Sequence, residues 1–144
     1  KSIYMWGSKE WGDFIKTYYK LHPKSKIVIV GGKSIDMQFS DEVSGALYGR
    51  RVPHKNLCGT TAGECVALLK KLRYFIAFPS GLPILACALS KPVFMFYLPF
   101  HDKLLYSWSP PEMIREETYK AAIFCAPNDM IKQVEAGWSP WKKK

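Results

Sequence analysis

The sequence contains no apolar run long enough to cross a membrane, because lysine or arginine breaks every hydrophobic stretch. A membrane-spanning helix needs about 20 consecutive apolar residues, so the sequence predicts none. Low-complexity tracts and internal repeats are also absent. Charged residues make up 23% and apolar residues 48%, which is close to the globular average and excludes a disordered chain.

The sequence lacks the cysteine and histidine patterns that are typical of metal sites and disulfide frameworks. The four cysteines (Cys58, Cys65, Cys87 and Cys125) form no C-x-x-C pair, and none has a histidine at zinc-finger spacing. Each lies among apolar residues, where a free thiol packs as a small hydrophobic group. We therefore expect reduced cysteines, no metal site and a cytoplasmic protein.

The common nucleotide-binding motifs are absent as well. Neither the P-loop spacing G-x-x-x-x-G-K-[ST] nor the dinucleotide fingerprint G-x-G-x-x-G occurs. No D-x-D pair is present to bring a metal ion to a diphosphate. These absences exclude the two motif classes and agree with chemistry that needs no metal.

Positive charge, in contrast, is plentiful, and the formal net charge is +9. An electropositive protein favours anionic partners, namely phosphate-bearing small molecules, nucleic acid or the surface of an anionic membrane. The basic residues are scattered rather than striped, and no signature of an RNA- or DNA-binding fold occurs. Specific nucleic-acid binding is therefore the least favoured of the three.

Hydrophobic patterning alternates between strand and helix along the chain. The continuous Ile/Val run in residues 26–32 is typical of a parallel strand buried on both faces. The expected strands are residues 3–6, 26–32, 56–59, 74–78, 92–98 and 121–126, and the expected helices are residues 11–21, 34–47, 61–72, 81–89 and 128–136. This order predicts a doubly wound α/β fold, with a mostly parallel β-sheet and helices on both faces.

Residues 1–138 are predicted to form one such Rossmann-like α/β domain, and residues 139–144 a basic tail. Because the first residue is Lys1 rather than methionine, we expect the chain to be part of a longer protein.

Ligands of doubly wound sheets bind outside the carboxyl ends of the strands, so the loops there hold the candidate site. The first loop places Ser8 and Lys9 at a helix N-terminus, where a lysine is favourable beside a bound anion; a solvated lysine is the alternative. The second loop permits close backbone approach at Gly32. Asp36, just after it, either hydrogen-bonds a ribose or faces solvent.

The third and fourth loops also begin helices. Thr60 offers a hydroxyl to a ligand, although simple helix capping explains the threonines here as well, with a capping box between Thr61 and Glu64. The fourth loop presents free N–H groups at a helix start, a geometry that binds phosphate. Its candidate residues are Ser80, Gly81 and Leu82. An ordinary serine cap followed by a proline in the first turn is the alternative.

The segment after residues 92–98 adds further polar and aromatic candidates. His101 and Lys103 are placed to reach the same ligand. Tyr106 and Trp108 either stack on a base or pack against the sheet edge. The sequence assigns no catalytic residue.

Residues 59–97 resemble the C-terminal half of GT-B glycosyltransferases of the heptosyltransferase type (glycosyltransferase family 9). The segment PSGLPILACALSKPVFMF at 79–96 runs parallel to the family's D-[ST]-G-x-x-H-x-A turn and helix, its G-K-P and its next strand. GSKEW at 7–11 is similar to the family's K-x-W loop, and IVIVGG at 27–32 to its second strand. Pro79 and Ile84 stand where the family has Asp and His.

The resemblance implies the Rossmann-like half of a GT-B fold, which binds the nucleotide-diphosphate sugar donor of an inverting, metal-independent transferase in glycan biosynthesis. It places Lys9 on phosphate, Ser80 and Gly81 on the diphosphate, and Asp36 nearest to the ribose-binding acid. It implies no cofactor besides the donor substrate.

The resemblance also implies a partner, the N-terminal domain of the same protein, which holds the acceptor and the catalytic base. The present chain alone is then inactive. The alternative is a non-catalytic α/β interaction module that has lost donor chemistry, which Pro79 and Ile84 favour because neither side chain can hydrogen-bond.

Overall fold

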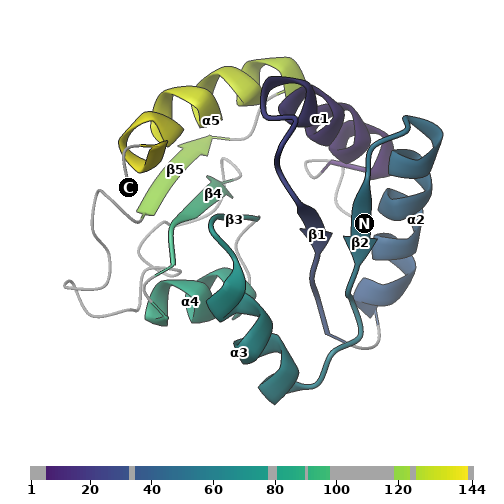
Figure 1. The fold of residues 1–144 in the computed structure, drawn as a ribbon, viewed down its shortest axis with the longest axis vertical. Helices are drawn as coiled ribbons and strands as arrows, with labels where there is room; N and C mark the ends of the chain where they lie inside the picture. The colour runs from purple at the N-terminus through teal and green to yellow at the C-terminus, as the bar shows by residue number, and fades with distance from the viewer. Residues whose placement is uncertain are drawn as a thin grey trace. The chain divides into compact units, whose positions relative to one another are not determined.

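The computed structural model describes residues 6–32, 35–77, 81–89, 91–97, 119–123 and 126–142 (Figure 1). Along these residues the helices are α1 (Ser8–Leu21), α2 (Ile35–Gly49), α3 (Ala62–Lys71), α4 (Gly81–Ala88) and α5 (Pro127–Lys142). The strands are β1 (Ile27–Ile29), β2 (His54–Asn56), β3 (Phe75–Ala77), β4 (Val93–Tyr97) and β5 (Tyr119–Ile123). The chain divides into two compact units, residues 1–65 with 126–131 and residues 66–125 with 132–144.

The strands are parallel and pair in two small sheets. In the first unit β1 pairs with β2, with Ile27 opposite His54. In the second unit β4 lies between β3 and β5. The predicted alternation of helices and parallel strands is thus confirmed, but the ladders do not join into one doubly wound sheet among the described residues. Most of the predicted strand at 3–6 lies outside them, and Trp6 is not in a strand.

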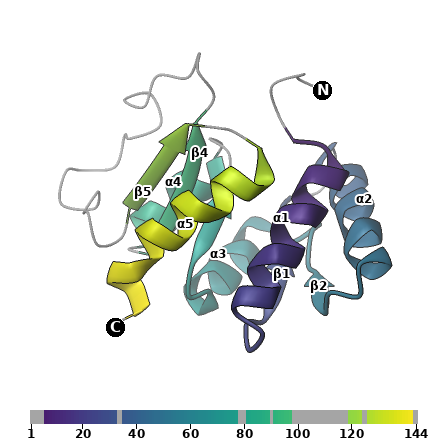
Figure 2. The ribbon, with the colours of Figure 1, turned by 90° about the horizontal axis from the view of Figure 1, so that it is seen from above.

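Helices α1 and α2 lie side by side in the first unit, and their facing surfaces form its core (Figures 1 and 2). The buried residues Val43, Leu47 and Val52 form one cluster with half-buried aromatic and aliphatic side chains of α1 and β1. Phe14 is also buried, and its ring centroid lies 5.2 Å from that of Trp6. Apolar spacing along α1 therefore decides which face of this helix packs inward.

An ion pair joins the middle of α1 to the residue that follows α2. The Arg50 guanidinium donates to Asp13 Oδ1 from Nε (3.0 Å) and Nη2 (2.8 Å), and from Nη1 to the Ala46 carbonyl (3.0 Å). Gly12 makes room for this contact. A Cβ at Gly12 would lie 3.0 Å from Arg50 Cζ and 3.1 Å from Ala46 Cβ, both uncomfortably close.

We therefore expect alanine to act differently at two helical glycines. Gly45→Ala, at an exposed site with open space around it, should raise the free energy of unfolding by about 1 kcal/mol, the ordinary gain over glycine in a helix. Gly12→Ala should lose that gain because Arg50 and Ala46 must move. Urea denaturation of both variants measures the difference, and an equal gain at the two sites would contradict the close helix contact.

Helix α2 ends in a Schellman motif. The Val52 N–H donates to the Leu47 carbonyl (3.0 Å) and the Arg51 N–H to the Tyr48 carbonyl (3.1 Å). Arg51 has φ = 58°, in the left-handed region that glycine usually occupies. The motif turns the chain into β2 and brings Val52 back into the core cluster with Leu47.

The second unit is built around β4. Val93 and Phe96 on β4 are fully buried, as are Ala86 on α4 and Val134 on α5. The two views place α4 on one side of the three-stranded sheet and α5 on the other (Figures 1 and 2). None of the helices in the described part of the chain is long and apolar enough to span a membrane.

Several predicted boundaries were wrong by a few residues. Helix α1 begins at Ser8 rather than residue 11, because the Glu10 carboxylate accepts a hydrogen bond from the Gly7 N–H (2.7 Å). The strand predicted at 26–32 covers only Ile27–Ile29 and is half-buried instead of fully buried. The strand predicted at 56–59 lies at His54–Asn56. Asn128 lies inside the first turn of α5, which begins at Pro127.

Candidate functional site

Two neighbouring loops meet at the carboxyl ends of β1 and β2. The Leu57 N–H donates to the Ile29 carbonyl (2.9 Å), and the Gly59 N–H donates to the Gly31 carbonyl (2.9 Å). The Cys58 thiol lies 3.4 Å from the Gly32 carbonyl oxygen. The parallel pairing thus continues beyond the strands, and it holds the loops containing Gly32 and Thr60 together.

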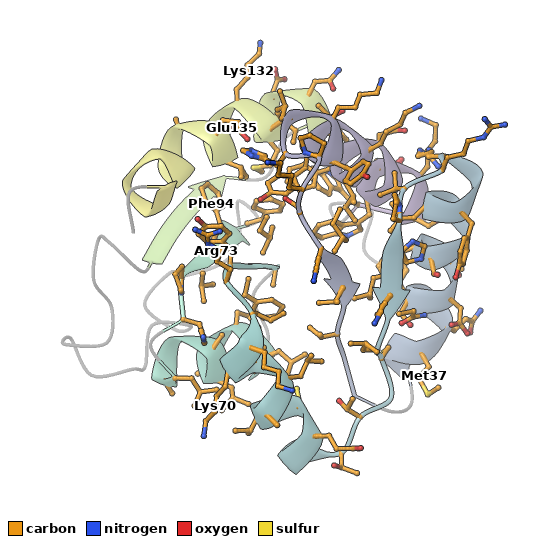
Figure 3. All side chains as sticks on the ribbon, in the orientation of Figure 1. Met37, Lys70, Arg73, Phe94, Lys132 and Glu135 are labelled. Carbon is orange, nitrogen blue, oxygen red and sulfur yellow. The ribbon has the colours of Figure 1, made fainter. Side chains whose placement is uncertain are left out.

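The loop after β2 turns at a glycine in the left-handed region. Gly59 has φ = +97°, which L side chains rarely adopt, and a Cβ there would lie 3.3 Å from Met37 Cε. Met37 is 42% exposed and lies at the lower end of α2 in Figure 3. An apolar side chain therefore covers the loop from the start of α2.

Thr60 carries the unexplained polar atom of this loop. Its Oγ1 is buried and has no hydrogen-bond partner among the described residues. A buried hydroxyl without a partner costs about 1–3 kcal/mol. In contrast, Thr61 and Glu64 form the predicted capping box, with the Thr61 N–H donating to Glu64 Oε1 (2.9 Å) and the Glu64 N–H to Thr61 Oγ1 (3.2 Å). Helix capping therefore accounts for Thr61 and leaves Thr60 unexplained.

The Asn56 side chain contacts both α2 and the loop after β2. Its amide nitrogen donates to Asp41 Oδ1 (3.1 Å) and lies 3.5 Å from Ser40 Oγ, while its oxygen accepts from the Cys58 N–H (3.2 Å). Asn56 thereby ties α2 to the β2 loop, and one oxygen of Asp41 is engaged in this contact. Sequence reasoning missed Asn56 because its partners on α2, Ser40 and Asp41, lie 16 and 15 residues away in the chain.

Ser8 and Lys9 lie in a different place within the first unit. The Lys9 carbonyl accepts a hydrogen bond from Arg50 Nη2 (3.4 Å), beyond the C-terminus of α2. Gly32 precedes the N-terminus of the same helix, whose 15 residues span about 22 Å. The structure therefore brings Gly32 and Thr60 together, but it does not bring Lys9 to them. Lys9 Nζ instead lies 3.2 Å from Asp13 Oδ2 and is 77% exposed.

Asp13 accepts hydrogen bonds from both cations. The contact with Arg50 is the larger cause that lowers the pKa of Asp13 from its ordinary value of 3.8, with Lys9 contributing less and burial opposing the shift. Because the folded-state pKa lies below the unfolded value, this interaction stabilises the fold above about pH 4 and is lost as the pH falls through the folded-state pKa.

Asp13→Asn should therefore lower the free energy of unfolding by about 1 kcal/mol near neutral pH, since the pair is partly exposed. The difference from the wild type should shrink below about pH 4, where protonation removes the same charge. Urea denaturation at a series of pH values measures this. A difference that persists at about pH 2 would contradict the assignment of the charge contact.

His54 and Ser44 form a second missed pair, ten residues apart. Ser44 Oγ lies 2.6 Å from His54 Nε2, and His54 Nδ1 lies 2.9 Å from the Val52 carbonyl. The carbonyl can only accept, so Nδ1 carries a proton. Since Ser44 is 7% exposed, this pair fastens α2 to β2.

In the second unit, helix α4 begins at Gly81, four residues after the last residue of β3. Gly81 is exposed, and a Cβ there would meet nothing within 4 Å. Its lack of a side chain is not required by packing or by a positive φ among the described residues. Leu82 is half-buried in the same first turn. The first N–H groups of a helix have no partner within the helix itself.

The remaining predicted site residues cannot be placed in the same way. Ser80, His101 and Lys103 lie outside the described residues, as do Tyr106 and Trp108. The backbone of Asp36 belongs to the first turn of α2, and its side chain is outside the description.

Cys58 and Cys65 are free thiols. Within the described residues, no group of three or more His, Cys, Asp or Glu side chains is arranged to hold a metal ion.

A shallow concavity of about 350 Å³ lies elsewhere in the first unit, lined by Asp13, Lys16, Thr17, Lys20 and residues 126–128. It includes none of the predicted site residues. Comparison with family models, curated proteins and solved structures gives no match for this chain.

Proposed function

We propose that this chain is the donor-binding domain of an inverting, metal-independent GT-B glycosyltransferase, and that it binds a nucleotide-diphosphate sugar. The observation that carries the proposal is the first turn of α4, which follows β3 closely and is open at Gly81. A helix N-terminus with space for close backbone approach suits a diphosphate. Within the first unit, the Thr60 hydroxyl has no partner among the described residues and is a separate candidate for a ligand contact.

The proposal includes the finer fold, one doubly wound Rossmann-like sheet as the C-terminal half of a GT-B protein. In the reaction, an acceptor hydroxyl displaces the diphosphate directly at the anomeric carbon of the sugar. The N–H groups at Ser80 and Gly81 stabilise the negative charge that develops on the leaving diphosphate. The N-terminal domain supplies the acceptor and the base. Lys9 has no role in this proposal, because it pairs with Asp13 and lies beyond the C-terminus of α2.

A second candidate is a non-catalytic module of the same fold. Pro79 and Ile84 favour it, because they stand where the resembling family has Asp and His. Such a module keeps the helix N-terminus but lacks two polar anchors for a donor.

Calorimetric titration with ADP, UDP, GDP and CDP tests the proposal. We expect saturable binding of one diphosphate by the wild-type chain and its loss in Ser80→Pro, which removes both the hydroxyl and the N–H. Circular dichroism confirms that the variant is folded. If no diphosphate binds up to millimolar concentration, the range of weak sites, the non-catalytic module is the better account.

A further inference from the structure

The first unit carries exposed positive charge at the edge opposite the glycine loops. The α1–β1 connection (residues 22–26) and the α2–β2 connection (residues 50–53) both lie at the amino ends of the parallel strands, at the top of Figure 1. Lys24 and Lys26 are exposed on the first connection and Arg51 on the second. Lys20, also exposed, lies in the last turn of α1.

This charge is not neutralised locally. Residues 14–32 contain four lysines and no aspartate or glutamate. Among the residues that the structure describes, no carboxylate pairs with Lys20, Lys24 or Lys26, whereas Lys9 and Arg50 both pair with Asp13. The connection therefore presents a positive potential that attracts anions.

An apolar side chain sits among these lysines. Leu21, between Lys20 and Lys24 in the sequence, is 52% exposed, and the adjoining Pro23 is exposed as well. The surface of an anionic bilayer binds exposed lysines and an exposed aliphatic side chain together. Its phosphates attract the lysines, and its acyl boundary accepts the aliphatic side chain. Single-stranded nucleic acid is bound instead by aromatic side chains that stack on its bases. The nearby Tyr18 ring packs against the His22 ring, with centroids 4.7 Å apart, which disfavours its stacking on a base.

We propose that the α1–β1 connection, with Lys20, Leu21, Lys24 and Lys26, docks this protein on the surface of an anionic lipid bilayer. The glycine loops lie at the other ends of β1 and β2, so docking leaves them open to solvent. Each lysine near an anionic leaflet contributes about fivefold in binding, which makes the three lysines together worth about a hundredfold.

Co-sedimentation with phosphatidylcholine vesicles containing 30% phosphatidylserine tests the proposal, at physiological ionic strength. The double variant Lys24→Glu/Lys26→Glu should bind at least about 25-fold more weakly than the wild type, from two lost lysines. The matched control is Lys55→Glu/Lys70→Glu, which makes the same change in net charge at exposed sites on β2 and α3. This control should retain most of the binding.

Leu21→Ser tests the apolar contact, with Met37→Ser as its control because Met37 is 42% exposed at another place. We expect weaker vesicle binding for the first variant and no change for the second. Equal losses in the two charge variants, or no loss in either, would overturn the proposal. So would binding to a 20-nucleotide RNA that depends on Lys24 and Lys26 while Leu21→Ser leaves vesicle binding unchanged.

Discussion

Gly81→Asp is expected to lower the affinity for a nucleoside diphosphate at least a hundredfold. A carboxylate at the first position of α4 would stand where we place the diphosphate. Two like charges about 4 Å apart at a protein surface repel by about 4 kcal/mol, so a hundredfold loss is a conservative expectation. The helix itself should not suffer, because an acidic residue in the first turn is favourable and a side chain at Gly81 meets open space.

Gly45→Asp is the matched control for charge. Gly45 is an exposed helical glycine with nothing near its Cβ direction, and it lies in α2, outside the predicted contact loops. Calorimetric titration should find wild-type affinity in this variant. Equal losses of affinity in the two variants would show that net charge, and not the first turn of α4, governs binding.

Phe14→Ala is expected to lower the free energy of unfolding by about 4 kcal/mol. The Phe14 side chain is 2% exposed, and its ring contacts Trp6 and Trp11 with centroids 5.2 and 5.9 Å away. Truncation removes the buried ring and leaves a cavity, which costs about 3–5 kcal/mol for phenylalanine. Urea denaturation followed by tryptophan fluorescence measures the loss, because the neighbouring rings report on this core directly.

Leu21→Ala on the same helix provides the comparison. Leu21 is 52% exposed, so its truncation should change the free energy of unfolding by no more than about 0.5 kcal/mol. Similar losses at Phe14 and Leu21 would contradict the face of α1 that we assign to the core.

Local signals in the sequence predicted the local structure well. The order of helices and strands from α1 to α5 follows from hydrophobic spacing, and the capping box between Thr61 and Glu64 forms as expected. Both features depend on residues close together in the chain, which is why a pattern can reveal them. Strand boundaries were less accurate because β1 and β2 are only three residues long and pairing decides where they end.

Contacts between distant residues could not be predicted in the same way. The bond between Asp13 and Arg50 joins residues 37 apart, and it connects the middle of α1 to the C-terminal end of α2. The residues around Lys9 in the sequence do not reveal the contact between Asp13 and Arg50. The distance between Lys9 and Gly32 in the fold could therefore not be predicted. The cover of Met37 over Gly59 depends likewise on how α2 packs.

An amide NMR titration of the chain with the four nucleoside diphosphates tests the central claim most directly. We expect saturable shifts of the Gly81 and Leu82 amide signals with one of these ligands, because their N–H groups would donate to its phosphates. Shifts confined to other parts of the chain, or none up to millimolar ligand, would contradict a diphosphate site at the start of α4.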